Sequence, residues 1–391
     1  MVKENNQIMK KFIPVIVAAA SFFALNSCGT PQYEQPTETS QKGFAISFFK
    51  NVVATSDSGE NLLVSPYSAG VALSMVAEGA EGQTRVEFDN ALNGCLFKSV
   101  DLGSNDTVTV KSANSVWITD DFSVRNRYVG LLENDFDAEV VNLDFADPAT
   151  VKAINNWCSE NTDGKITEIV DRLSPSMVML LVNALYFNAP WADAFLESNT
   201  KDGVFHAATG PQQVQMMSKT ESLNYAEYQG CQMVELPYEG DRYAMYVVLP
   251  PSGVKMDKMI SYLNEGLYEK AMSALYPCKV RLTMPKFKLE TSLVLNNALQ
   301  NMGVRTAFTP AADFKGIAEM GPLVLDQVKQ KCYIEVSEKG TEAAAVTSVG
   351  IRLTSARPET MVTMTVDRPF FFFIADRTDD NILFAGRILT I

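Results

Sequence analysis

Hydrophobic and polar positions alternate along a stretch near the C-terminal end of the chain. From residue 341 to residue 353 the odd-numbered positions are small or apolar, and the positions between them are more polar. Such alternation predicts a strand with one buried face. The stretch is also rich in Ala, a weak strand former, and Gly340, Gly350 and Pro358 punctuate it like a loop. Two interpretations stay open: a loop that becomes a strand in a second state, or an ordinary Ala-rich strand or short helix.

Helix and strand patterns recur along the rest of the chain. Apolar residues spaced three and four apart predict helices at residues 43–55, 69–78, 84–92, 127–136, 149–160 and 292–302. Alternating or continuous apolar runs predict strands at residues 106–118, 138–145, 177–187, 280–289, 323–337, 361–375 and 382–391. Two further strands are predicted within residues 233–249, around a turn at residues 239–241. Both element types therefore belong to one folded region.

The most apolar of these runs contains one polar residue. Residues 177–187 read Met-Val-Met-Leu-Leu-Val-Asn-Ala-Leu-Tyr-Phe, which is typical of a strand covered on both faces. Asn183 lies in the middle of this run, and a buried amide costs free energy unless it forms hydrogen bonds. We therefore expect polar partners for Asn183 from other parts of the chain.

Composition and charge argue against several classes of function. The chain has 391 residues, 47% of them hydrophobic, which is ample for a large core, and its net charge is −13. Nucleic-acid binding is not expected, because phosphate contacts require clustered Lys and Arg. A Ser-His-Asp or Cys-His enzyme is not expected either, because the one histidine, His206, lies in a polar stretch without a nucleophile motif.

No motif indicates a metal or a cofactor. The chain lacks a phosphate-binding loop, a dinucleotide fingerprint and a His-Glu-x-x-His motif. The cysteines after position 28 lack metal-ligand spacing, and most of them are expected to be small buried side chains: Cys95, Cys158, Cys231, Cys278 and Cys332. The Asp-rich residues 376–381 are typical of a hairpin turn.

The first forty residues predict export. Three lysines (Lys3, Lys10 and Lys11) accompany an apolar run at residues 12–25 that is short for a membrane span. Leu25-Asn26-Ser27-Cys28 resembles the lipobox of bacterial lipoproteins, which implies a signal peptide at residues 1–27 and a lipid on Cys28. Residues 28–42 predict a flexible tether. We expect a lipid-anchored protein, periplasmic or at the cell surface of a bacterium, whose only membrane contact is the lipid; a plain secretory signal and a secreted protein is the alternative.

Three motifs resemble those of one family. Residues 338–345 read Glu-Lys-Gly-Thr-Glu-Ala-Ala-Ala and resemble the hinge of the reactive-centre loop in inhibitory serpins. Ser65-Pro66-Tyr67-Ser68 resembles the start of the helix under the central serpin sheet, and residues 366–372 resemble the C-terminal signature. The resemblance covers about residues 43–391. It implies a serpin domain of the α+β class, with three β-sheets, eight or nine helices and an exposed reactive-centre loop at about residues 338–358.

The resemblance implies an inhibitor rather than an enzyme. A serine protease, or alternatively a cysteine protease, would cleave the loop and form an acyl-enzyme. The freed loop would then insert into the central sheet as a strand of about 15 residues, near 50 Å long at roughly 3.3 Å per residue, and carry the protease with it. The alternating pattern fits this, because the same residues would have to live in water and then in a sheet. A non-inhibitory serpin that acts as a binding protein or a protease substrate is the alternative.

The usual loop length in the family places the cut between Thr354 and Ser355. A Thr before the cut suits an elastase-like target. Other registers remain open, since Leu353 suits chymotrypsin- or subtilisin-like enzymes, and Arg352 or Arg357 suits trypsin-like ones.

The resemblance also assigns supporting roles. The hinge comprises Glu338, Gly340, Thr341, Glu342, Ala343, Ala344 and Ala345. Ser65, Ser68 and Asn183 form the shutter, where the sheet opens, and Trp191 belongs to the breach at its top. Glu338 is expected to pair with Lys286. The chain departs from many relatives at Gln330, which aligns with the shutter histidine; glutamine can also donate and accept hydrogen bonds, so the network can survive this change.

Overall fold

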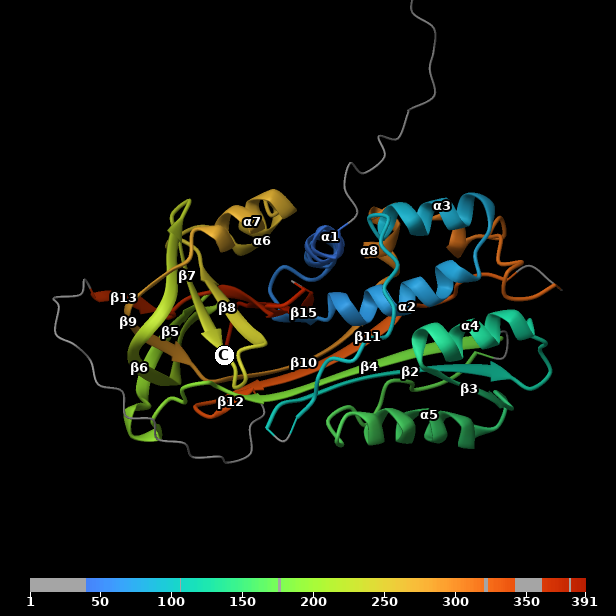
Figure 1. Cartoon of the computed structure of the whole chain (residues 1–391), viewed down its shortest axis with the longest axis horizontal. Helices are drawn as coiled ribbons and strands as arrows, with labels where there is room; N and C mark the ends of the chain where they lie inside the picture. Colours follow the sequence, from blue (N-terminus) through green and yellow to red (C-terminus); the bar gives the residue numbers. More distant parts are fainter. Residues whose placement is uncertain (1–39, 106, 175–176, 320–322, 342–360, 380) are drawn as a thin grey trace, which may run out of the picture. The chain divides into compact units, whose positions relative to one another are not determined.

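The chain folds into eight α-helices and two β-sheets within the described residues, which are 40–105, 107–174, 177–319, 323–341, 361–379 and 381–391 of a computed structural model (Figure 1). Residues 36–391 form one compact unit. Its helices are α1 (Gln41–Thr55), α2 (Pro66–Glu78), α3 (Gly82–Ala91), α4 (Asn126–Phe136), α5 (Pro148–Asn161), α6 (Met256–Ser261), α7 (Glu265–Ser273) and α8 (Asn296–Asn301). The predicted α+β class is confirmed.

A six-stranded sheet holds the features that matter for function. Its order is β10 (Phe287–Val294), β11 (Lys329–Val336), β12 (Gly340–Thr341), β4 (Met179–Pro190), β2 (Thr109–Thr119) and β3 (Ala138–Leu143). The strands are antiparallel to their neighbours except β2 and β3, which are parallel. In Figure 1 the long strands β4, β10 and β11 run together beneath α2.

The second sheet has nine strands. Its order is β1 (Leu62–Val64), β15 (Ile382–Ile388), β14 (Phe370–Asp376), β8 (Tyr243–Leu249), β7 (Cys231–Pro237), β6 (Gly210–Tyr228), β9 (Tyr276–Pro285) and β13 (Met361–Thr365), with β5 (Lys201–Ala207) paired to β6. The expectation of three separate sheets needs correction here. The 19-residue β6 pairs with β5 along residues 210–216, with β9 along residues 216–225 and with β7 along residues 225–228, so it joins two groups of strands into one sheet.

Helix α2 is the buried centre of the unit. Its sequence PYSAGVALSMVAE begins with Pro at the first helical position, and the side chain of Ser65 accepts a hydrogen bond from the Ser68 backbone N–H. Such a cap satisfies one of the free N–H groups at a helix start. Eleven of its residues are buried, and it packs against both β4 and β15. The helix therefore links the two sheets through the core.

Several predicted elements are shorter than their apolar pattern. Residues 280–289 form parts of two strands, because the chain passes from β9 to β10 at Lys286, between the two sheets. Residues 361–375 likewise divide into β13 and β14, since Pro369 cannot donate a strand hydrogen bond. Residues 292–294 end β10, so the helix predicted from residue 292 begins only at Asn296. The strand predicted at residues 323–337 begins only at Lys329.

The pattern of apolar and polar residues failed to predict some elements and located the rest well. β1, β5, β6, α6 and α7 were not predicted, because their sequences are polar or short. The remaining helices and strands lie within a few residues of their predicted bounds. No helix in the described part of the chain is long and apolar enough to cross a membrane.

Candidate functional site

One strand position in the six-stranded sheet is filled by only two residues. Gly340 of β12 pairs with Pro190 of β4, and Thr341 pairs with Ala189 of β4 and with Val336 of β11. Beyond these two residues, β4 and β11 share no strand pairing in the described part of the chain. Each of these strands pairs with a neighbour on its other side. We call this unfilled strand position between β4 and β11 the slot.

Glycine is required at the top of the slot. Gly340 has φ +151°, and a Cβ there would lie 2.2 Å from the carbonyl oxygen of Ala189. The next residue, Thr341, is fully buried, and its hydroxyl shares a hydrogen bond of 2.6 Å with the hydroxyl of Tyr238. The Tyr238 ring stacks on Trp191 at 4.5 Å. The hinge therefore enters the sheet beside the stacked rings of Tyr238 and Trp191.

The chain just before the slot is held by charge and by backbone hydrogen bonds. Glu338 pairs with Lys286 at 2.9 Å and accepts a hydrogen bond from the Thr200 hydroxyl at 2.7 Å. Burial alone would raise the pKa of the Glu338 carboxyl, but the hydrogen bonds from Thr200 and Lys286 hold it below its usual value. The indole N–H of Trp191 donates to the carbonyl of Ser337 at 2.9 Å. The predicted pair of Glu338 and Lys286 is present.

A polar cluster lies lower in the slot. The side-chain amide of Gln330 on β11 accepts from the Ser65 backbone N–H at 2.9 Å and donates to the Ser65 carbonyl at 2.8 Å. Ser68 donates to the side-chain oxygen of Asn183, whose amide donates to Asn114 on β2. The structure therefore brings together the four predicted shutter residues and gives Asn183 the polar partners expected for it. Gln330 itself bonds to the Ser65 backbone.

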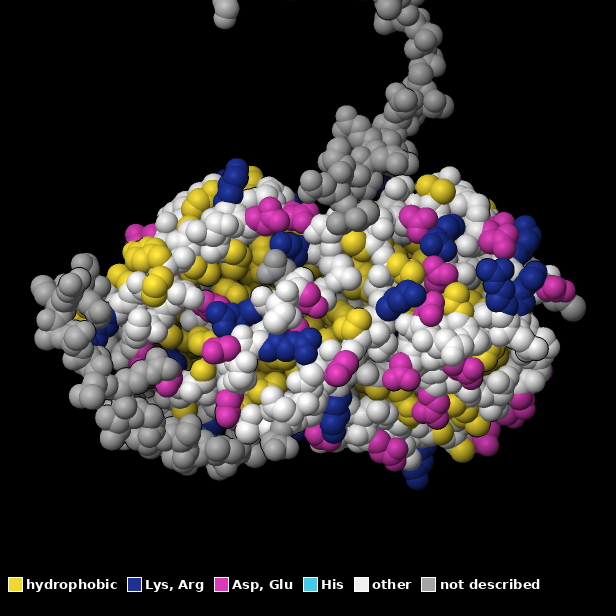
Figure 2. All heavy atoms as spheres, in the orientation of Figure 1, with side chains coloured by type: hydrophobic (Ala, Val, Ile, Leu, Met, Phe, Trp, Pro, Cys, Tyr) yellow, Lys and Arg dark blue, Asp and Glu magenta, His cyan; other side chains and the backbone are white. Residues whose placement is uncertain are grey.

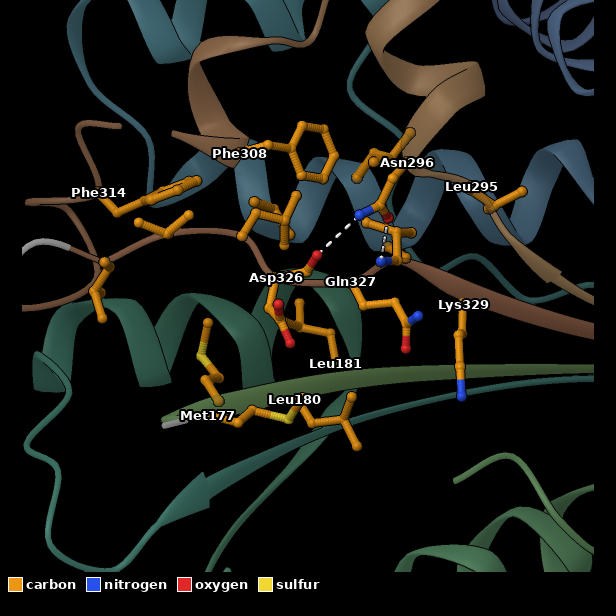
Figure 3. A pocket seen from close by; sticks show the side chains of 18 of the residues that line it. Met177, Leu180, Leu181, Leu295, Asn296, Phe308, Phe314, Asp326, Gln327 and Lys329 are labelled. Atoms are coloured by element: carbon orange, nitrogen blue, oxygen red, sulfur yellow. Dashed lines mark hydrogen bonds between the residues drawn. The ribbon is translucent and has the colours of Figure 1, made fainter. Parts of the chain in front are cut away.

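A cavity continues the slot below this cluster (Figure 3). Its volume is about 580 Å³, and its lining combines apolar side chains with Asn183 and Gln330. Leu181 and Met177 come from the β4 side, whereas Asp326 and Gln327 come from the segment before β11. That segment is held away from β4 because its backbone bonds to Asn296 at the start of α8, through Asp326 and Val328. The cavity is thus the space that separates the lower ends of the two strands.

The outer face of β11 is tied to the segment that follows α5. Lys329 pairs with Asp171 at 3.3 Å, and Lys331 donates to the carbonyl of Glu168 at 3.0 Å. The ammonium of Lys165 lies 5.1 Å from the centre of the Tyr333 ring. A new strand in the slot would therefore lie under this segment.

Other predicted residues lie apart from the slot or outside the described residues. Exposed His206 is on β5. Burial raises the pKa of the cysteine thiols, to about 11 for Cys158 and about 12 for Cys332, which fits inert core side chains. No cluster of three or more His, Cys, Asp or Glu within the described ranges could hold a metal. The predicted residues outside the described ones are Cys28, Glu342, Ala343, Ala344, Ala345, Arg352, Leu353, Thr354, Ser355 and Arg357.

Three residues of the site were not predicted. Tyr238 directly follows β7, and Thr200 directly follows a short 3-10 helix at Glu197–Asn199. Nothing in the local sequence of either residue signals a role. Asn114 lies on β2 between Ala113 and Ser115, in a stretch that is not continuously apolar, so it lacks the signal that Asn183 gives on β4.

Comparison with known proteins identifies the fold. The sequence profile of the family described as Serpin (serine protease inhibitor) matches residues 39–391. The chain belongs to the serpin family. It is similar to an uncharacterized serpin-like protein of Thermococcus kodakarensis, with 34% identity covering 91% of this chain and 86% of that protein. Intracellular coagulation inhibitor 2 of Tachypleus tridentatus is 32% identical, with 84% of this chain and 86% of that protein covered.

A solved serpin structure gives the same result. The thermophilic serpin tengpin in its native state has a TM-score of 0.81 and 30% identity, covering 90% of this chain and 93% of that one. The predicted serpin fold and family are therefore confirmed. The family is described as one of serine protease inhibitors, and the expectation that this chain is not an enzyme agrees with that description.

Proposed function

We propose that this serpin is a suicide inhibitor of serine proteases, with cysteine proteases as a further target class. Its cleaved loop fills the slot as a new strand while the protease is attached as an acyl-enzyme. The slot carries the proposal, because β4 and β11 flank a strand position that β12 has already started. Filling it adds about ten backbone hydrogen bonds, each worth about 0.5–1.5 kcal/mol net.

The register of β12 supports this assignment. If the chain continues past Thr341 in register, Thr347 lies opposite both Asn183 of β4 and Gln330 of β11. Thr341 faces the core, so the odd-numbered residues that follow it face the core as well. Val349 and Ile351 would then point into the cavity. The alternation seen in the sequence thus matches polar and apolar surroundings in the right order.

The scissile bond in this proposal is Thr354–Ser355. In the same register Leu353 lies opposite Met177, two residues before β4 begins at Met179. The loop up to the cut is therefore about as long as the slot. An elastase-like target fits Thr354, and cuts after Leu353, Arg352 or Arg357 would admit chymotrypsin-, subtilisin- or trypsin-like targets.

A non-inhibitory serpin is the second candidate. The observation that favours it is Gln330, whose amide is bonded twice to the Ser65 backbone. A shutter held in this way opens more slowly, and deacylation then releases the protease before the loop has inserted. Such a serpin would be cleaved as a substrate.

The test mixes residues 41–391 with an elastase-like, a chymotrypsin-like and a trypsin-like protease. We expect a complex that survives a denaturing gel and a released C-terminal peptide whose mass begins at Ser355. A stable complex with a released peptide that begins at another residue would place the scissile bond elsewhere and still support the proposed mechanism. Cleavage by all three proteases without a complex would contradict inhibition and favour the second candidate.

We propose further that the protein is exported and anchored by lipid on Cys28, as its N-terminal sequence suggests. The test expresses the full chain and Cys28→Ser in a bacterium and separates membrane from soluble fractions. Detergent-dependent extraction of the wild type, lost in the variant, is expected. Equal soluble fractions for both proteins would indicate a plain secretory signal.

A further inference from the structure

Two basic side chains lie two residues apart on one strand of the nine-stranded sheet. Lys279 and Arg281 lie on β9, and Arg281 is exposed while Lys279 is half-buried. Within the described residues, neither side chain forms an ion pair or a hydrogen bond. Several other basic residues of the unit have carboxylate partners, and on the face seen in Figure 2 the two signs are interspersed.

Strand pairing shows which residues surround these two side chains. Lys279 lies between Ser222 of β6 and Met361 of β13, and Arg281 lies between Thr220 and Thr363 of the same strands. Paired residues point to the same face of a sheet. These four neighbours are exposed and uncharged. We call the six residues in these two rows the basic face.

The basic face lies next to the loop that the protease cuts. Met361 follows Thr354 by seven residues, which span at most roughly 23 Å when extended. A protease of about 230 residues has a radius of gyration of about 17 Å. A protease held at this bond is therefore wide enough for its body to contact the start of β13 and the neighbouring part of β9.

We propose that the basic face is a docking surface for an acidic patch on the target protease. This inference rests on the proposed inhibitory function and adds a determinant of target choice outside the loop. Arg and Met are enriched in protein interfaces, and both are present. Because the serpin carries a net charge of −13, two unopposed cations beside the loop also give an incoming acidic protease a favourable local approach.

The test measures the association rate constant with a protease that forms the gel-stable complex. Lys279→Glu with Arg281→Glu reverses both charges and is expected to lower this rate about tenfold at low salt. The same change should flatten the salt dependence of the rate. The matched control reverses Arg127 and Lys152 to Glu, because both are exposed on α4 and α5, at the opposite end of the unit in Figure 1.

The outcomes separate the two proposals. If no protease forms a complex even with the wild type, the inhibitory function fails, and the docking surface fails with it. If complexes form and both double variants slow association equally, only the docking surface is overturned. If wild type binds a sulfated polysaccharide through Lys279 and Arg281 while protease association is unchanged, the surface belongs to a polyanion, and the proposal is again wrong. Thermal unfolding of both double variants verifies that they fold.

Discussion

At the residue scale, one side chain decides how firmly the shutter is closed. Gln330 is buried and supplies both a donor and an acceptor to the Ser65 backbone. The Ser65 carbonyl also accepts from the Ala69 backbone N–H, but the Ser65 N–H has Gln330 as its acceptor. The sequence indicated that glutamine could take part in this network. It could not indicate which of the shutter groups glutamine would bond, because that depends on distances across three elements.

We expect Gln330→Ala to lower the free energy of unfolding by about 1–3 kcal/mol, because it leaves a buried N–H without an acceptor. Urea unfolding followed by circular dichroism measures the change. Gln300→Ala is the control, since Gln300 lines the same cavity and its side chain is exposed. Equal stability of the two variants would mean that the Gln330 bonds contribute nothing.

Glu338 gives the hinge a defined pH range. Its pKa is lowered in the folded protein, so its contribution to stability is present above the usual glutamate pKa of about 4.3 and is lost as the pH falls through the folded value. The slot contains no histidine in the described residues, and histidine is the side chain whose ordinary pKa lies between about pH 5 and 8.

We therefore expect wild type to unfold at a higher temperature than Glu338→Gln by a constant margin from about pH 5.5 to 8. The margin should shrink below about pH 4.3. Calorimetry across this range measures it, with Glu133→Gln, an exposed change on α4, as the control. A margin that changes between pH 6 and 7 would show that another group controls the hinge.

At the element scale, the two-residue strand β12 is, in the proposed mechanism, the start of a longer strand. Its existence could be predicted only in part. Alternation in the sequence predicted a strand from residue 341, and Gly340 was predicted to punctuate it, but local pattern could not show that the strand begins between β4 and β11. The split of residues 280–289 between two sheets was missed for the same reason, because apolar pattern reports burial and does not say which sheet provides it.

Insertion should be blocked by a charge at the first buried position. Thr341→Arg places a large cation where the native side chain is fully buried, so we expect nearly all of this variant to be cleaved without complex formation. The stoichiometry of inhibition measures this. Thr341→Ser keeps the hydroxyl and should inhibit like wild type. Glu342→Arg adds the same side chain at the next position, which alternates to the other face, and should keep most inhibition; equal loss in both Arg variants would argue against the proposed register.

At the scale of the whole molecule, the slot between β4 and β11 is occupied only by the two residues of β12 within the described part of the chain. Most of the helices and the long strands of the six-stranded sheet were predictable, because amphipathic spacing indicates the elements and the family resemblance indicates their arrangement. The joining of the other strands into one sheet through β6 was not predictable. The unfilled strand position was predictable only through that resemblance. Its physical basis appears in the structure: β4 and β11 are held apart by β12 at one end and by the bonds of residues 326–328 to Asn296 at the other.

The most direct measurement of this account compares the unfolding temperature of the intact serpin with that of the protein cut once in the reactive loop. The account predicts a rise of about 10–20 °C after cleavage, since roughly ten new hydrogen bonds add about 5–15 kcal/mol to a domain of this size. The Thr341→Arg variant should show a much smaller rise. An unchanged or lower unfolding temperature after cleavage of the wild type would contradict insertion of the loop into the slot.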